Sequence, residues 1–176
     1  MRGLTHGALR PLTATRASVR VVSSDLRRAL GSAWLTTDVV RRTVESDARL
    51  RELSFGEWDG KTWGEIERTD PVRLRLWMER WTEAAAPGGE SVADLLRRAS
   101  SWLASNIPQH AAPGAPSQAI VVVSHAGWIR AAVSHLLGSD IRKMFDIPAD
   151  HAHVTVIDVG PGGARLVMSN ATRVDP

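Results

Sequence analysis

Residues 119–127 read Ala-Ile-Val-Val-Val-Ser-His-Ala-Gly. The five apolar residues predict a β-strand, and because both of its faces are apolar we expect a buried strand of a parallel sheet. Ser124 and His125 follow this strand, and residues 128–137 predict a helix with Gly138 as its C-cap. His125 therefore comes directly after a buried strand, at the edge of the sheet where α/β proteins bind their ligands.

A second strand-to-helix junction lies near the start of the chain. Residues 19–22 predict a short β-branched strand that ends at the two serines 23–24, and we expect a helix from Asp25 onward. A helix N-terminus favours anions, and an arginine in its first turn, here Arg28, can hold a phosphate through two parallel hydrogen bonds. We expect Arg28 and His125 to face the same edge of the sheet.

The rest of the chain alternates strands with helices. Ser91, with Asp94 three residues later, predicts a capping box at the start of an amphipathic helix. We also expect a strand over 39–44, a loop over 49–60, helices over 62–68 and 71–83, a loop over 108–118, and a final hairpin of 153–159 and 164–168. This alternation predicts an α/β sandwich with a largely parallel sheet, and we find no repeat and no second domain in residues 1–176.

The composition is that of an ordinary soluble domain, with 43% apolar and 23% charged residues among 176. The chain has no cysteine, which excludes disulfides and thiolate metal sites, and its histidines are not spaced as metal ligands. No apolar run approaches the roughly 20 residues that cross a bilayer, and the N-terminus has no signal-peptide core. We expect a cytoplasmic protein with no membrane partner and no metal.

The net charge is +3, and two of the 22 basic residues, Lys61 and Lys143, are lysines. The arginines occur in scattered pairs with acidic residues between them, so no long basic stripe forms. For the excess of arginine we favour a compositional bias of the genome over a nucleic-acid-binding surface. We therefore expect no nucleic-acid partner.

The loop over residues 50–60 holds carboxylates among apolar side chains. Glu52 lies next to Leu53 and close in sequence to Phe55. An apolar environment raises the pKa of a carboxyl group, which suits it to act as a general acid. On its own this segment also fits an ordinary polar loop.

Four segments, taken in order, resemble the signature of the histidine phosphatase (phosphoglycerate mutase-like) superfamily. They are Ser24-x-Leu26-x-Arg28-Ala29, then Leu50-Arg51-Glu52 with Phe55-Gly56-Glu57-Trp58-Asp59-Gly60, then Gly88-Gly89-Glu90-Ser91, and then Ser124-His125-Ala126-Gly127. The resemblance covers roughly residues 19–140. It implies a three-layer αβα sandwich around a largely parallel sheet.

In this superfamily the histidine of an Arg-His-Gly motif, at the end of the first strand, attacks the phosphoryl group, and water hydrolyses the phosphohistidine. By resemblance, Arg28 and Ser24 bind the substrate's phosphoryl group, and Gly127 allows a close approach of the backbone. His125 hydrogen-bonds the phosphoryl group as its charge develops, and Glu52 aligns with the proton donor to the leaving oxygen. The resemblance implies no cofactor.

The Arg-His-Gly motif itself is missing. One interpretation takes Thr5-His6-Gly7 as a degraded form of the motif. The other aligns residues 7–13, which end in Pro-Leu-Thr, with a later loop of the family, so that the catalytic strand lies upstream of Met1. We favour the second, on which the sheet lacks its first, central strand and leaves backbone groups unpaired.

We therefore expect a phosphomonoesterase that acts on a small-molecule phosphate ester, with Arg28, Glu52 and His125 in one pocket. Residues 55–60 and 87–91, and those that follow His125, are most similar to α-ribazole phosphatases. As written, the chain should have little activity. The alternatives are a non-catalytic phosphate-binding relative and a phosphotransferase of the phosphoglycerate mutase type, and a homodimer is left open.

Overall fold

The computed structural model describes residues 18–40, 43–107 and 118–172. Three parallel strands form its central sheet in the order β2-β1-β3. The strands are β1 (Ser18–Ser23), β2 (Val44–Ser46) and β3 (Gln118–Val123). β1 pairs with β3 along its whole length, so these two strands end side by side. The parallel strands predicted from residues 19–22 and 119–123 are thereby confirmed.

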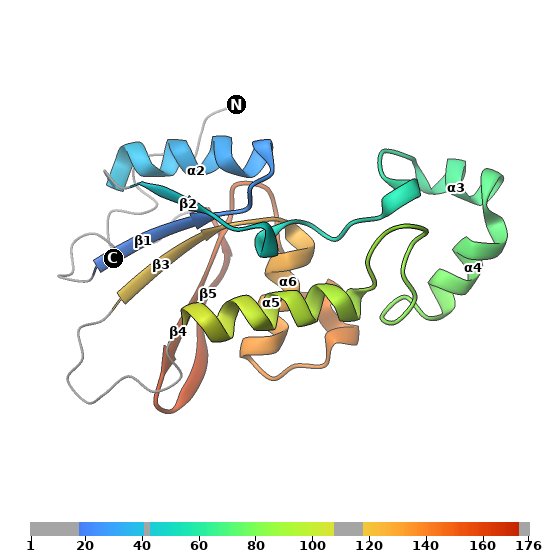
Figure 1. Cartoon of the computed structure of the whole chain (residues 1–176). Helices are drawn as coiled ribbons and strands as arrows, with labels where there is room; N and C mark the ends of the chain where they lie inside the picture. Colours follow the sequence, from blue (N-terminus) through green and yellow to red (C-terminus); the bar gives the residue numbers. More distant parts are fainter. Residues whose placement is uncertain (1–17, 41–42, 108–117, 173–176) are drawn as a thin grey trace.

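Helices cover both faces of this sheet (Figure 1). α2 (Arg27–Val40) lies on one face, and α5 (Val92–Asn106) and α6 (Ala126–Leu136) lie on the other. The result is the expected three-layer αβα arrangement. β4 (Val154–Gly160) and β5 (Gly163–Ala171) form the predicted hairpin, which pairs antiparallel as a separate two-stranded sheet.

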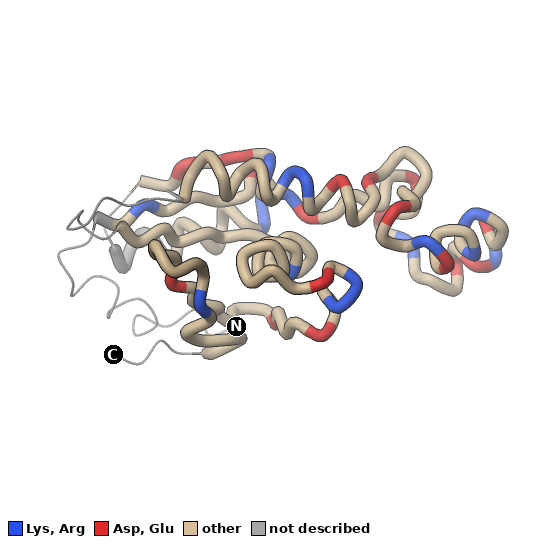
Figure 2. The backbone as a smooth tube through the Cα atoms, turned by 90° about the horizontal axis from the view of Figure 1, so that it is seen from below, with Lys and Arg blue, Asp and Glu red and all other residues tan. Residues whose placement is uncertain are grey.

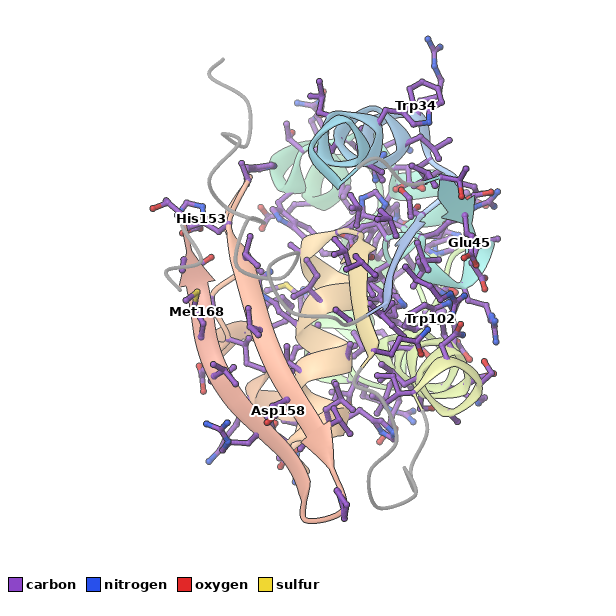
Figure 3. The ribbon with its side chains drawn as sticks, turned by 90° about the vertical axis from the view of Figure 1, so that its left-hand side faces the viewer. Trp34, Glu45, Trp102, His153, Asp158 and Met168 are labelled. Atoms are coloured by element: carbon purple, nitrogen blue, oxygen red, sulfur yellow. The ribbon has the colours of Figure 1, made fainter. Side chains whose placement is uncertain are left out.

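The main core lies between the sheet and the pair of helices α5 and α6. Trp102 of α5 meets Trp128 of α6 edge to face, with ring centroids 5.6 Å apart. Val22, Leu50 and Leu95 complete the centre of this cluster, and all of these side chains are buried. Trp34 of α2, by contrast, points away from the sheet into solvent (Figure 3).

The predicted capping box is present at the start of α5. Ser91 Oγ accepts a hydrogen bond from the Asp94 amide (3.1 Å), and the Asp94 carboxylate accepts one from the Ser91 amide (3.1 Å). The Ser91 hydroxyl and Arg97 also donate to this carboxylate and lower the pKa of Asp94 to about 2. The capping box thus fixes the start of α5, the helix that carries much of the core.

A helical arm, residues 55–88, extends from the body of the molecule. It contains α3 (Trp63–Thr69) and α4 (Pro71–Glu79), which lie far from the central sheet (Figure 1). The arm has a small core of its own, formed by Trp58, Ile66, Leu74 and Ala86. Basic and acidic positions are interleaved along both the body and the arm, as the sequence predicted (Figure 2).

Two predicted element boundaries are wrong. The strand predicted over residues 39–44 is not formed, because α2 continues through Val40 and β2 begins only at Val44. β-branched residues cost a helix less than about 0.7 kcal/mol each, so a helix already packed on the sheet extends through them. The helix predicted over 71–83 ends at Glu79, and turns follow it.

Residues 119–123 of β3 are half-buried, although their apolar pattern predicts full burial on both faces. The reason is that β3 pairs with β1 alone among the strands of the described ranges. The prediction of a missing first strand falls outside the residues that the structure describes. So does the loop predicted over 108–118, except for Gln118, which begins β3. In the part that is described, no helix has both the length and the apolar character needed to span a membrane.

Candidate active site

The ends of β1 and β3 bring two polar segments together. The Ser24 amide donates a hydrogen bond to the Val123 carbonyl (2.9 Å), which continues the strand pairing one residue beyond β1. His125 is the N-cap residue of α6, and its Nε2 lies 2.9 Å from Ser24 Oγ. Both side chains are buried. The parallel register therefore builds this contact between residues that are far apart in the sequence.

Arg28 contacts His125 from the solvent-exposed side. It lies in the first turn of α2, and its Nε donates a hydrogen bond to His125 Nδ1 (3.2 Å). Because Nδ1 accepts this bond, the imidazole proton is on Nε2, which donates to Ser24 Oγ. Arg28 is exposed and His125 is buried, so a ligand from solvent meets the guanidinium first.

Two effects keep His125 neutral. Burial has the larger effect and the positive charge of Arg28 the next, and both lower the pKa of His125 below its ordinary value of 6.5. The negative charge of Glu52 acts in the opposite direction with a smaller effect. At neutral pH the imidazole is therefore an uncharged group that donates through Nε2 and accepts at Nδ1.

Glu52 reaches the same place from the loop that follows β2. Its Oε2 accepts a hydrogen bond from the Gly127 amide (3.2 Å), and its Oε1 accepts one from the Leu53 amide (3.0 Å). A Cβ on Gly127 would overlap Oε1 of Glu52. A larger residue at 127 would therefore displace the carboxylate, which approaches the backbone here at the N-terminus of α6, where negative charge is favoured.

The structure brings together all five residues that the sequence predicted for the site. Ser24, His125 and Arg28 form one hydrogen-bonded chain. Glu52 and Gly127 lie beside it at the start of α6. We call these five residues the His125 cluster. The expected convergence of Arg28, Glu52 and His125 is present, and the chemical roles assigned to them stay predictions.

Sequence reasoning missed two ion pairs that frame the His125 cluster. Arg51 binds Asp25 through two hydrogen bonds (2.7 and 2.6 Å), which lower the pKa of that carboxyl group. Arg98 binds Glu90 in the same bidentate manner (2.9 and 2.8 Å). Glu90 lies in one of the four signature segments, but no pattern distinguishes Arg98 from other polar positions of its amphipathic helix.

The other described histidines lie elsewhere. His135 is in the last turn of α6, at the end opposite His125. His153 bonds to the carbonyl of His151 (3.0 Å) in the turn before β4. His6 lies outside the described residues. Within the described ranges, no three metal-binding side chains come together.

Comparison with known proteins identifies the family. The sequence profile of the histidine phosphatase superfamily (branch 1) matches residues 6–172. The chain belongs to this superfamily. It is 36% identical to glucosyl-3-phosphoglycerate phosphatase of Mycolicibacterium vanbaalenii over 129 residues, which are 71% of this chain and 56% of that protein. It is 30% identical to phosphoserine phosphatase 1 of Hydrogenobacter thermophilus over 137 residues, 78% of this chain and 63% of that protein.

The fold of this superfamily member is shared with solved structures. The α-ribazole phosphatase of Shigella flexneri has a TM-score of 0.79 at 20% identity, over 96% of this chain and 81% of that chain. At this identity the likeness concerns the fold alone. The matched region covers little more than half the length of glucosyl-3-phosphoglycerate phosphatase, at 56%. The relatives named above are phosphatases, and membership of the superfamily supports a hydrolase.

Acidification below about pH 6.5 is expected to destabilise the protein through His125. The folded-state pKa of His125 lies below its unfolded value of 6.5. Its contribution is therefore fully present above that value and is lost as the pH falls. The measurement is the free energy of unfolding against pH for wild type, His125→Gln and His135→Gln. We expect His125→Gln alone to flatten the slope, and equal slopes for wild type and His125→Gln would contradict the assignment.

Proposed function

We propose that this chain is a phosphomonoesterase, impaired in this form, whose His125 cluster binds the phosphoryl group of a small phosphate ester. The observation that supports this most directly is the contact between an exposed Arg28 and a buried, neutral His125. The N-termini of α2 and α6 meet at this point, and helix N-termini attract anions. Arg28 uses Nε toward His125, which leaves the guanidinium Nη groups for phosphoryl oxygens.

The proposed reaction proceeds in two steps. A histidine nitrogen attacks phosphorus, the ester P–O bond breaks, and the leaving oxygen takes a proton from Glu52, which enters this step as the protonated acid. Water then attacks the phosphohistidine, its proton passes to the Glu52 carboxylate, and phosphate leaves. Arg28 and His125 stabilise the charge on the phosphoryl oxygens in both steps.

Among the described residues, no second imidazole hydrogen-bonds to the His125 cluster, which supports an attacking histidine outside them. The candidates are His6 and a histidine in a segment N-terminal to Met1. The relatives suggest the substrates to test, namely a phosphoglycerate ester and phosphoserine, both of which carry a carboxylate beside the phosphate. The shared fold adds α-ribazole phosphate as a third.

Phosphate binding is the first test of the proposal. We expect millimolar phosphate or vanadate to raise the melting temperature of wild type and of Arg27→Ala, but not of Arg28→Ala. Arg27 is the matched control because it is the exposed neighbour of Arg28 in the same helical turn. Wild-type protein that shows no shift, or a shift that survives Arg28→Ala, would count against the proposal.

Measurements of turnover distinguish a phosphomonoesterase from a non-catalytic phosphate-binding relative and from a phosphotransferase. We expect little hydrolysis of p-nitrophenyl phosphate by this chain and robust hydrolysis after an N-terminal extension that ends in Arg-His-Gly. Robust activity of the chain itself, abolished by His6→Ala, would make His6 the nucleophile and refute this expectation. Binding without turnover in either form indicates the non-catalytic relative, and phosphoryl transfer to an added alcohol instead of water indicates the phosphotransferase.

A further inference from the structure

Arg98 uses its whole guanidinium group in contacts within the protein. Its Nε and Nη2 donate to the two carboxylate oxygens of Glu90 (2.9 and 2.8 Å). Its Nη1 donates to the carbonyls of Arg49 (2.8 Å) and Arg51 (2.7 Å), and its Nη2 also donates to the carbonyl of Glu52 (3.2 Å). A guanidinium has five N–H groups. Each of them therefore has an acceptor.

The three carbonyls belong to the segment that carries Glu52. Residues 51–55 lie outside the described helices and strands, and the guanidinium supplies hydrogen-bond donors to carbonyls of this stretch of backbone. The side chain of Arg98 is only 17% exposed. Its planar fork fixes the direction of each bond, which a lysine ammonium does not.

Glu90 holds the same segment from the other side. Its Oε2 accepts a hydrogen bond from the Ser54 amide (3.2 Å), and its own amide donates to the Ser54 carbonyl (2.9 Å). The ion pair of Arg98 with Glu90 thus contacts the backbone both before and after Leu53. The backbone of Glu52 is therefore held at its own carbonyl by Arg98 and two residues later, at the Ser54 amide, by Glu90. These contacts restrict the position of the Glu52 side chain.

The helix that carries Arg98 also supports the rest of the site. α5 packs on α6 through Trp102 and Trp128, and α6 begins directly after His125. Arg98 therefore fixes the Glu52 segment to the same two helices that fix His125. A displacement of about 1 Å between reacting groups costs on the order of a hundredfold in rate, so such a connection matters for proton transfer.

We infer that Arg98, paired with Glu90, is a positioning residue that holds the Glu52 carboxylate against the α6 N-terminus beside His125. The inference rests on the proposed function only where it makes Glu52 the proton donor. The placement of Glu52 itself has a readout that needs no activity. Gly127 is the second residue of α6, so its amide has no acceptor within the helix, and Glu52 is its hydrogen-bond partner.

The test is hydrogen exchange at the Gly127 amide in the full chain, measured by NMR. Glu52→Ala gives the rate without the carboxylate. We expect Arg98→Lys and Arg98→Met to accelerate exchange toward that rate by about tenfold, since a bond to a charged acceptor is worth roughly that factor. Arg97→Met is the matched control, because Arg97 is an exposed neighbour that pairs with Asp94, and it should leave the rate unchanged.

A general loss of stability would not accelerate exchange at Gly127 in the Arg98 variants alone. The inference is overturned if Arg98→Met lowers the melting temperature but leaves Gly127 exchange slow. Glu90→Gln, which keeps the shape of the side chain, serves if Arg98→Met does not fold, and it should also accelerate exchange. Phosphate binding is measured in parallel, so wild type that fails to bind phosphate refutes the proposed function without affecting the exchange result.

Where turnover is measurable, the leaving group gives a second readout. An alkyl phosphate needs a proton on its leaving oxygen, whereas p-nitrophenolate leaves more readily without one. We expect Arg98→Lys to reduce kcat for phosphoserine at least about tenfold more than kcat for p-nitrophenyl phosphate, as misplacement of a proton donor predicts. Equal losses for both substrates would refute a role through Glu52.

Discussion

Gly56→Ala is expected to lower the free energy of unfolding by about 3 kcal/mol, the sum of a left-handed backbone and a steric overlap. Gly56 has φ of +53°, and a Cβ there would lie 2.5 Å from the backbone of both Gly88 and Gly89 and closer still to the Pro87 carbonyl. These are backbone atoms, so no side chain can rotate away. The two loop segments are also joined by a bond from the Glu57 amide to that carbonyl (2.8 Å).

Gly60→Ala is the matched control for this prediction. Gly60 has φ of +80°, but nothing lies within 4 Å of the position that a Cβ would take there. Its replacement should cost about 1 kcal/mol, for the backbone conformation alone. Urea unfolding of the two variants measures the difference, and equal losses would show that the loops separate easily.

Trp102→Ala is expected to cost about 3–5 kcal/mol, the range for removal of a large aromatic side chain from a core. Trp102 is 1% exposed and lies at the centre of the main cluster, against Trp128. Its indole also makes the smallest of the contributions that lower the pKa of the Asp47 carboxyl group, for which Arg49 is the main cause. The cost is a large part of the roughly 5–15 kcal/mol that stabilises a typical domain.

Trp34→Ala provides the comparison for Trp102→Ala. Trp34 is 62% exposed on α2, and an exposed replacement of this kind should change the free energy of unfolding by less than about 1 kcal/mol. Both variants are compared by urea unfolding with tryptophan fluorescence. A cost at Trp102 no greater than that at Trp34 would mean that the α5–α6 interface is not the main source of stability.

The sequence predicts the His125 cluster well because the cluster depends on strand ends. Once residues 19–22 and 119–123 are taken as parallel neighbours, Ser24 and His125 must end at the same edge. Arg28 then follows from its place one turn into the next helix. This inference needs only the order of elements and the direction of strands, both of which are visible in the pattern of apolar residues.

Arg98 was not predictable by the same reasoning. Three of its acceptors are backbone carbonyls, which every residue has and no sequence pattern reveals. Tertiary packing likewise decides that α2 continues through Val40 where the β-branched residues predict a strand. The sequence thus indicates which side chains can do chemistry, while the contacts that hold them in place are known only from the folded chain.

In the free protein the groups of the His125 cluster already satisfy one another. Arg28 donates a hydrogen bond to Nδ1 of the imidazole ring, and Ser24 Oγ accepts one from its Nε2–H. An arriving anion therefore binds at the Nη edge of the guanidinium, because Nε is already held by His125. A chloride ion or a single carboxylate brings one negative charge to this edge, whereas a phosphoryl group brings two and is attracted more strongly. We expect the His125 cluster to select doubly charged anions over monovalent ones.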